Sequence, residues 1–416
     1  MRIATVNSNA RIAGGIESYL DRALPALAAR GDRIALLCDY NTDAARPRIA
    51  AELEFPIWSI NEIGVERAFA ELRRWRPELI FAHGLADPAH EATLAAIAPA
   101  AFFAHDYRAT CVSGLKRFGT PVETPCARRF GAGCLPRFFP RRCGGLNPAT
   151  MIANYRRAAA RLSALARYRA VLTASRHMRA ELTRHGLAEE IVHCVGLPIA
   201  NDRERADDRN CGDGTSVAAP SRILFVGRME PVKGGPLLID AAALATVALN
   251  RPLTLTLAGD GRERARWERR AQSVTRREPR LRIGFDGWRD RAAIAARFEE
   301  TDVIAIPSIW PEPFGMVGLE AGMRGVPACA FALGGIPEWL DDGVNGYLAP
   351  ADPPRAAALA HALVKCLADP DVHRRMRAAA GAAARRHSMA AHLTALDEVF
   401  ARLMDAGGAG ERAGHN

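Results

Sequence analysis

The chain has 416 residues, of which 49% are apolar and 25% charged, with only nine cysteines. This length exceeds one ordinary hydrophobic core, so we expect a globular protein of two domains and exclude a scaffold held together by disulfides. The net charge of +10 lies mostly in the first half, because residues 101–200 hold 16 Lys+Arg against 5 Asp+Glu.

This basic stretch suits an anionic membrane, a phosphorylated acceptor or a nucleic acid, or it is simply a solvated arginine-rich face. We expect no nucleic-acid partner, since no zinc-finger or aromatic–basic pattern accompanies the charge. The N-terminus lacks the apolar stretch of a signal peptide, and no run of eighteen apolar residues is present to span a bilayer. We therefore expect a cytoplasmic protein, peripheral at most to the inner face of the membrane.

Residues 1–200 alternate between apolar runs of strand length and amphipathic helices, and we assign them to an N-terminal domain. The runs read RIATV (from Arg2), DRIALLCDY, PELIFAHG, AAFFAHD and AVLTASRHM. Gly14–Gly15 separates the first run from a helix that closes at Gly31. Strands that alternate with helices predict a parallel sheet covered on both faces.

A second series of strands and helices follows residues 201–220, which have the polar composition of a linker. Its strands read RILFVGR, LTLTLAGDG, LRIGFDGW and DVIAIPS, and we assign residues 221–387 to a C-terminal domain. A final helix over 388–406 is expected to pack back toward the first domain, and 407–416 to form a tail. The predicted fold class is α/β, with two doubly wound Rossmann-like domains facing across a cleft, because ligands bind beyond the carboxyl ends of parallel strands.

The stretch EPFGMVGLE sets Glu312 and Glu320 eight positions apart. Pro311 and Pro313 prevent a helix up to that point, and the residues after them have a helical pattern, so Phe314 to Val317 is expected at a helix N-terminus. There the free amides of Gly315, Met316 and Val317 can bind an anion. Along one helix axis eight residues span roughly 12 Å, comparable to a sugar diphosphate. The alternative is an acid that stabilises the helix dipole, followed by a solvated glutamate.

Two cations stand close together in FVGRMEPVKGG, where Arg228 and Lys233 flank a tight loop after a strand. They could neutralise a pyrophosphate, or they could be surface charges. Lys233 is one of only three lysines in the chain, which otherwise uses arginine. This choice of residue favours the functional interpretation.

The combined pattern resembles glycosyltransferase family 4, the large group of retaining enzymes with the GT-B fold. The resemblance rests on AGGIESYLDRALPALAARGDRIALL, ILFVGRMEPVKGG, LAGDG, FDGW and the run from PSIWPEPFGMVGLE to APADP. It implies that Arg228 and Lys233 hold the donor phosphates, that Glu320 binds the ribose, and that Glu312 lies beside the donor sugar. With the helix N-terminus described above, the expected donor-binding residues are Gly15, Arg228, Lys233, Phe314, Gly315, Met316, Val317 and Glu320. The resemblance makes residues 221–387 the donor-binding domain and residues 1–200 the acceptor-side domain.

Histidines end two neighbouring strands of the first domain. The resemblance places His105, in FFAHDYR, in the catalytic pocket, although a hydrogen-bonded core histidine is the alternative. His83, in IFAHG, is either pocket wall or core. The loop GGIPEWL from Gly334 resembles one that closes on the donor, with an ordinary turn as the alternative.

No metal or other cofactor is expected. The one Asp-x-Asp match, Asp369-Pro-Asp371, lies between helical stretches and is expected to cap a helix. An insertion at about 107–146 carries Cys111, Cys126, Cys134 and Cys143, whose spacing lacks paired C-x2-C knuckles, although a structural zinc remains an alternative. We interpret this insertion as an acceptor-side lid or a membrane-facing loop.

The sequence thus predicts a retaining, metal-independent glycosyltransferase that moves a sugar from a UDP-, GDP- or ADP-sugar to a glycan or lipid-linked acceptor, in polysaccharide or glycolipid biosynthesis. The alternatives are a nucleotide-sugar epimerase of similar twin-domain fold and a non-catalytic nucleotide-sugar-binding module. The donor base, the sugar and the acceptor are not encoded in a motif.

Overall fold

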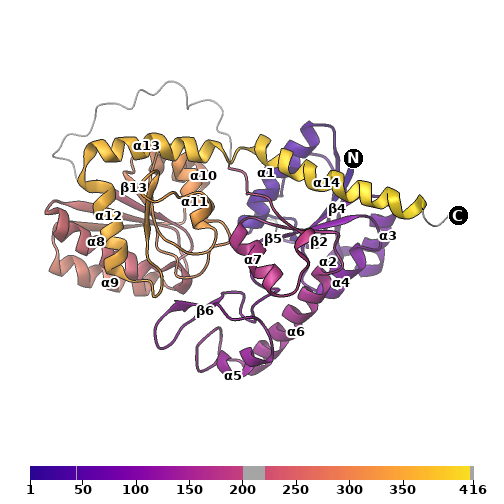
Figure 1. Ribbon diagram of the computed structural model, residues 1–416, viewed down its shortest axis with the longest axis horizontal. Helices are drawn as coiled ribbons and strands as arrows, with labels where there is room; N and C mark the ends of the chain where they lie inside the picture. Colours follow the sequence, from indigo (N-terminus) through magenta and orange to yellow (C-terminus); the bar gives the residue numbers. More distant parts are fainter. Residues whose placement is uncertain (44, 200–220, 413–416) are drawn as a thin grey trace. The chain divides into compact units, whose positions relative to one another are not determined.

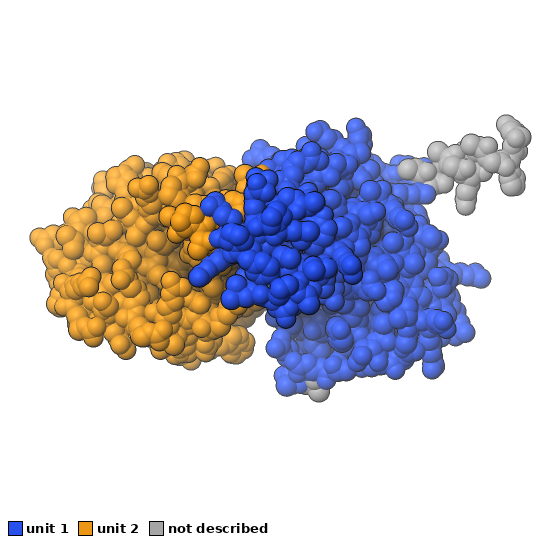
Figure 2. Space-filling view, turned by 90° about the horizontal axis from the view of Figure 1, so that it is seen from below, with its two compact units in different colours: residues 1–115, 128–198, 389–416 blue, residues 116–127, 199–388 orange. Residues whose placement is uncertain are grey.

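The computed structural model describes residues 1–43, 45–199 and 221–412, so the predicted linker 201–220 lies outside the described residues. The chain divides into two compact units (Figures 1 and 2). Unit 1 comprises residues 1–115, 128–198 and 389–416, and unit 2 comprises 116–127 and 199–388. The units are thus not the contiguous segments 1–200 and 221–387, since a short hairpin of the insertion groups with unit 2.

Unit 1 is built on a seven-stranded parallel sheet in the order β3-β2-β1-β4-β5-β8-β9. Its strands are β1 (Arg2–Asn9), β2 (Arg33–Tyr40), β3 (Ile57–Ser59), β4 (Leu79–Gly84), β5 (Ala100–Ala104), β8 (Ala170–Thr173) and β9 (Val192–Cys194). The central strands are buried along nearly their whole length, as expected of a parallel sheet covered on both faces.

The helices of unit 1 follow the strands in alternation. They are α1 (Gly15–Ala29), α2 (Ile60–Ile63), α3 (Val65–Trp75), α4 (Pro88–Leu94), α5 (Leu135–Phe138), α6 (Pro148–Leu165), α7 (Arg176–Arg184) and α14 (Met389–Arg412), with 3-10 turns η1 (Ala132–Cys134) and η2 (Glu189–Ile191). The prediction of a helix over 388–406 followed by a tail was wrong in its end point, because α14 continues to Arg412. α14 packs against α1.

Unit 2 is built on a six-stranded parallel sheet in the order β12-β11-β10-β13-β14-β15. Its strands are β10 (Ser221–Val226), β11 (Leu253–Ala258), β12 (Leu281–Gly287), β13 (Val303–Ile306), β14 (Ala328–Phe331) and β15 (Gly346–Ala349). A separate antiparallel hairpin joins β6 (Arg117–Phe118) to β7 (Thr124–Pro125). Together the two parallel sheets confirm the predicted α/β class.

The helices of unit 2 are α8 (Gly235–Leu249), α9 (Arg264–Arg277), α10 (Arg291–Glu299), α11 (Met316–Gly322), α12 (Ala356–Ala368) and α13 (Pro370–Arg385), with 3-10 turns η3 (Pro231–Lys233) and η4 (Ile336–Glu338). In the described part of the chain one helical stretch, Pro231–Leu249, is long and apolar enough to cross a membrane, and half of it is buried. Because α8 packs against α9 and α12, burial within the unit accounts for its apolar composition.

Candidate functional site

The centre of the candidate site in unit 2 is an ion pair between Lys233 and Glu312. The ammonium nitrogen of Lys233 lies 2.6 Å from Oε1 of Glu312, and the hydroxyl of Ser308 donates to the same oxygen over 2.5 Å. Lys233 follows β10 and Glu312 follows β13, which are neighbours in the sheet. Residues beyond the carboxyl ends of adjacent parallel strands meet at one edge, and this topology therefore brings the two side chains together.

Glu312 is charged despite its burial. Only 7% of the residue is exposed, and burial by itself would raise the pKa of its carboxyl group. The charge of Lys233 and the hydrogen bonds from Lys233, Ser308 and Trp310 outweigh this effect and lower the pKa. The carboxylate is thus an anion fixed in a single position.

The loop that begins GGIPEWL closes on the backbone of Glu312. The amide of Gly335 donates to the carbonyl oxygen of Glu312 over 2.7 Å. Gly334 has a φ of +63°, and a Cβ at this position would lie 2.2 Å from that same oxygen. Only glycine permits this approach, so the loop holds Glu312 from the backbone side.

Two further glycines position Lys233. Gly234, in the left-handed region, would place a Cβ 1.9 Å from the carbonyl oxygen of Pro307, and Gly235 would place one 2.3 Å from the ring of Trp267. The segment K-G-G therefore lies directly against the end of β13 and the core. As a result the ammonium of Lys233 also lies 5.7 Å from the centre of the Trp310 ring.

Arg228 is not part of this ion pair. It lies in the loop after β10, is exposed, and its side chain forms no hydrogen bond or salt bridge with another described residue. Arg228 is therefore accessible to a ligand, and it does not interact directly with Lys233 in the described structure.

The idea that Glu312 and Glu320 lie along one helix axis was wrong. α11 begins only at Met316, after Gly315 with a φ of +84°, so Glu312 belongs to the preceding loop and Glu320 to the helix. Phe314 is buried, its carbonyl accepts a 2.7 Å hydrogen bond from Trp339 Nε1, and its ring contacts His387. Phe314 thus supports the loop through packing, while Met316 and Val317 form the first turn of α11.

In unit 1, His83 and His105 end β4 and β5 and are joined by a hydrogen bond. His83 Nδ1 lies 2.9 Å from His105 Nε2. Both rings belong to an aromatic cluster on one face of the sheet, in which His105 stacks on Phe103 at 4.5 Å between ring centres. Burial, followed by the charge of His392, lowers the pKa of His105 to about 3, so its imidazole is neutral near physiological pH.

Helices α1 and α14 cover this cluster with a second hydrogen-bonded pair. The hydroxyl of Tyr19 lies 2.9 Å from Nε2 of His392, and Nδ1 of His392 lies 2.7 Å from the carbonyl oxygen of Gly196. The Tyr19 ring also lies 5.6 Å from His105. The predicted site residue His105 is therefore surrounded by side chains that the motifs did not indicate.

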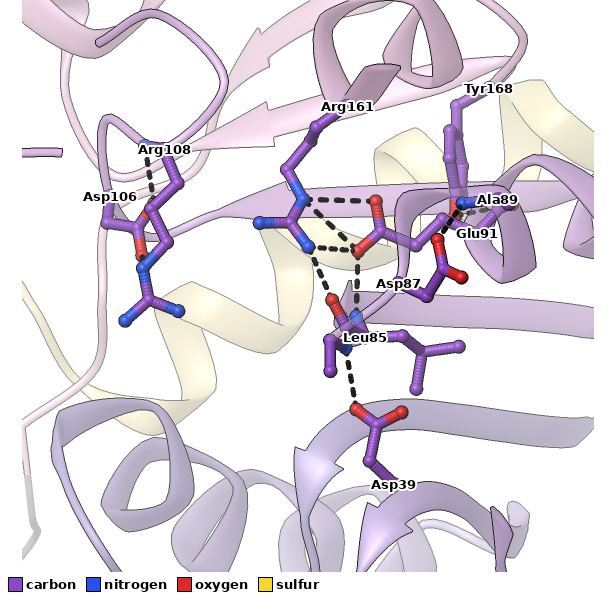
Figure 3. A network of polar contacts seen from close by, with 10 residues as sticks. Asp39, Leu85, Asp87, Ala89, Glu91, Asp106, Arg108, Arg161 and Tyr168 are labelled. Carbon is purple, nitrogen blue, oxygen red and sulfur yellow. Dashed lines mark hydrogen bonds and ion pairs between the residues drawn. The ribbon is translucent and has the colours of Figure 1, made fainter. Parts of the chain in front are cut away.

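A network of buried charges fixes the loop that follows His83 (Figure 3). Glu91 on α4 is fully buried, accepts a 2.7 Å hydrogen bond from the amide of Leu85, and is paired with Arg161 of α6 at 2.9 Å. Arg161 also donates to the carbonyl of Leu85. Asp39 of β2 accepts a hydrogen bond from Ala86 over 2.7 Å, so the loop is held from two sides.

At the start of α1, Gly15 borders open space. A Cβ at Gly15 would meet no atom within 4 Å in the described structure, and Gly14 before it is extended. The Gly15 backbone is thus open to close approach in the described structure.

The cysteine-containing insertion forms a small apolar cluster of its own. Cys134 and Cys143 pack with Phe138 and Met151, and Cys111 lies beside Ser113. In the described parts of the chain no group of three or more His, Cys, Asp or Glu side chains could hold a metal ion. Asp369 caps α13 by accepting from the amides of Asp371 and Val372, as its position predicted.

Sequence reasoning missed four residues that contact the predicted site residues or their neighbours, namely Ser308, Trp310, Tyr19 and His392. His392 lies 373 residues from Tyr19, and Ser308 stands in the predicted strand DVIAIPS without a motif. The single available signal was the proximity of Ser308 and Trp310 to Glu312 in the sequence.

Comparison with known proteins finds a family match within the C-terminal half of the chain. Residues 215–386 match the family described as Glycosyl transferases group 1. The chain is 31% identical over 165 residues to an uncharacterized 41.2 kDa protein in the cps region of Klebsiella pneumoniae, covering 39% of this chain and 42% of that protein. It is 34% identical over 191 residues to phosphatidyl-myo-inositol mannosyltransferase of Mycobacterium tuberculosis, covering 44% and 48%. The matches thus span less than half of each relative's length.

Solved structures extend the likeness to the whole chain. HepE of Anabaena in complex with UDP superposes with a TM-score of 0.67 at 20% identity, covering 97% of this chain and 100% of that one. At this identity the likeness shows the fold, which agrees with the two parallel sheets described above. The protein therefore has the GT-B fold, and residues 215–386 match the family of glycosyl transferases group 1.

Proposed function

We propose that the protein is a retaining glycosyltransferase of family 4 that moves a sugar from a nucleotide-sugar donor to an acceptor hydroxyl. The observation that carries the proposal is the partly buried Lys233–Glu312 pair at the strand ends of a domain that matches a glycosyltransferase family. A fixed cation beside a fixed anion suits a ligand that combines a diphosphate with sugar hydroxyls. The mannosyltransferase named above and the UDP bound by HepE support a nucleotide-sugar donor.

In the proposed reaction the bond between the anomeric carbon and the diphosphate oxygen breaks, and the acceptor oxygen bonds to that carbon on the same face. The proton of the acceptor hydroxyl passes to the departing phosphate. Lys233 and Arg228, with the amides of Gly315 to Val317, neutralise the charge that develops on the diphosphate. No metal is required, because these groups supply the positive charge.

The remaining site residues bind and orient the donor. Glu320 holds the ribose, Glu312 lies beside the transferred sugar, His105 contacts that sugar, and the Gly15 backbone borders the phosphates. We place the reaction in the cytoplasm, in the synthesis of a cell-surface polysaccharide or glycolipid.

A thermal-shift screen with UDP, GDP, ADP and their common sugar conjugates, with and without chelator, tests the donor. A ligand at 100 times its dissociation constant adds roughly 2.7 kcal/mol of stability. We expect one nucleotide to stabilise wild type and the control Glu398→Ala, which changes an exposed residue of α14, but not Glu320→Ala. If no nucleotide shifts the transition, the donor assignment is wrong.

Product analysis tests the transfer step. With donor and acceptor present, we expect a glycoside whose anomeric configuration, read by proton NMR, matches that of the donor. An inverted product would overturn retention, and activity abolished by chelator would overturn metal independence. Conversion of the donor without an acceptor would indicate an epimerase, and binding without conversion a non-catalytic module.

We further propose that unit 1 contacts an anionic membrane that carries the acceptor. Residues 124–180 contain 12 arginines and no Asp or Glu. On α6, Arg156 and Arg157 are exposed and form no salt bridge with another described residue, and Leu146 beside its start is 77% exposed. Unpaired arginines on a helix whose start follows an exposed leucine suit the headgroup region of a bilayer.

Vesicle cosedimentation tests this contact with a matched pair of variants. Arginines near an anionic surface contribute about 1 kcal/mol each, so Arg156→Gln/Arg157→Gln should bind phosphatidylserine vesicles roughly 30-fold more weakly. The control Arg276→Gln/Arg277→Gln removes an equally exposed pair from α9 and should bind like wild type. If both double variants bind these vesicles equally, or if the protein binds vesicles without anionic lipid equally well, Arg156 and Arg157 do not form a contact with an anionic membrane.

A further inference from the structure

The hydrogen bond between His83 and His105 can carry its proton in only one of two ways. Either His83 Nδ1 donates to His105 Nε2, or His105 Nε2 donates to His83 Nδ1. The choice decides which nitrogen of His105 is protonated, because a neutral imidazole carries a single N–H. It therefore decides whether His105 offers a ligand a donor or an acceptor.

The neighbouring pair is already determined by its partners. Nδ1 of His392 faces the carbonyl oxygen of Gly196, which only accepts, so this nitrogen carries the proton. Its Nε2 then has a lone pair, to which the hydroxyl of Tyr19 donates. The protons of Tyr19 and His392 are therefore both used in these hydrogen bonds and are not available to His83 or His105.

The far side of His83 resolves the remaining choice. His83 is 5% exposed, and its Nε2 is buried without a hydrogen-bond partner among the described residues. If His105 were the donor, His83 would carry its proton on this Nε2, which would leave a buried N–H with no acceptor. If His83 is the donor, Nε2 holds only a lone pair, and an unpartnered buried acceptor is tolerated better than an unpartnered N–H.

We propose that His83 is a positioning residue that holds His105 as the Nδ1–H tautomer, so that His105 meets its ligand as a hydrogen-bond donor and not as a base. His105 Nε2 is occupied by His83, and its Nδ1 is not among the buried atoms without a partner. Nδ1–H is thus the group left to approach a ligand. That this ligand is the transferred sugar rests on the proposed function, whereas the tautomer does not.

The tautomer is measured directly in the ligand-free full-length protein. A two-bond proton–nitrogen correlation spectrum of 15N-histidine-labelled protein separates the two neutral tautomers, and the His105 signals are assigned by their loss in His105→Phe. We expect the proton on Nδ1 of His105. A proton on Nε2 overturns the proposal, whatever the enzyme does.

Two variants of His83 separate the hydrogen bond from the packing. The side-chain amide of His83→Asn can donate from nearly the position of Nδ1, whereas His83→Phe fills the aromatic cluster without a donor. We expect His105 to keep its Nδ1–H tautomer in His83→Asn and to lose it, wholly or in part, in His83→Phe. An unchanged tautomer in His83→Phe would show that His83 does not control His105.

Kinetics then connect the tautomer to the reaction. Loss of one oriented hydrogen bond should lower kcat of His83→Phe on the order of tenfold, with KM nearly unchanged, and His83→Asn should recover most of kcat. Equal kcat in all three proteins, with the tautomer behaving as expected, would remove His105 from the transfer step. Absence of transfer in wild type would instead count against the proposed function.

Discussion

Lys233 and Glu312 lie 79 positions apart in the chain, yet their charged atoms are 2.6 Å apart. The carboxylate is almost fully buried and also accepts from Ser308, while the lysine side chain is 23% exposed. A phosphate that binds Lys233 must therefore share this ammonium with Glu312. This relationship links the stability of unit 2 to the proposed phosphate site and allows the two to be tested separately.

Replacing Lys233 should reduce both stability and turnover. Lys233→Met leaves Glu312 buried without its cation, which costs about 2 kcal/mol of unfolding free energy. Loss of a phosphate contact should cost about 3 kcal/mol in the transition state, roughly 100-fold in turnover. Urea unfolding and a transfer assay measure the two effects.

Two comparisons sharpen this prediction. Lys233→Met/Glu312→Gln removes the uncompensated charge and should recover stability but not turnover. Lys365→Met changes an exposed lysine of the same unit and should resemble wild type in both assays. Near-normal turnover in Lys233→Met would show that Lys233 does not bind the donor.

The loop at Gly334 should tolerate no side chain. Gly334→Ala combines a positive φ with a Cβ 2.2 Å from the carbonyl oxygen of Glu312, so we expect a loss of about 3 kcal/mol in unfolding free energy and reduced turnover. Gly343→Ala is the control, because its φ is +76° but its nearest atom is 3.9 Å away. It should cost about 1 kcal/mol, and equal losses in both would show that the close approach contributes nothing.

The network in Figure 3 should be strongly coupled. Arg161→Leu leaves the fully buried Glu91 unpaired and should cost about 3 kcal/mol of unfolding free energy. Glu91→Gln in the same chain should recover part of this loss, and Arg157→Leu, on the exposed side of α6, should change stability by less than about 0.5 kcal/mol. Additive effects of the Arg161 and Glu91 changes would contradict the coupling.

The buried histidines should make the protein less stable in mild acid. Burial lowers the pKa of His105 to about 3 and of His392 to about 4, against an ordinary value of 6.5 in the unfolded chain. Below pH 6.5 the unfolded state therefore binds protons that the folded state does not. The contribution of these histidines to the unfolding free energy should be fully present above pH 6.5. It should fall by about 1.4 kcal/mol per pH unit for each such histidine as the pH decreases toward 4.

Urea unfolding at pH 7, 6 and 5 measures this slope. His392→Gln should reduce it by the contribution of one histidine, whereas His361→Gln, at an exposed position, should leave it unchanged. The comparison cancels the titration of carboxylates that all three proteins share. An identical slope in His392→Gln would show that His392 is not buried as a neutral ring.

Several helix and strand positions were predictable because each depends on local pattern. The apolar runs RILFVGR and DVIAIPS became β10 and β13, and Asp369 capped α13, since a strand or a cap needs only a few adjacent residues. The short edge strands β3 and β9 were missed, because three residues are too few for a period to appear. The end of α14 was placed too early because the tail's glycines favoured a coil.

The sequence by itself determined the two alternating series of strands and helices, the charged residues around Glu312 and the family that they resemble. These follow from periodicity and from residue types at fixed spacing. Only the tertiary structure decided that Lys233 pairs with Glu312, that Gly334 lies against the Glu312 backbone, and that His83 bonds to His105 beneath Tyr19 and His392. The physical reason is that each of these contacts joins the ends of different strands or helices. Their proximity depends on the order of strands in a sheet and on helix packing, and a local sequence pattern predicts neither.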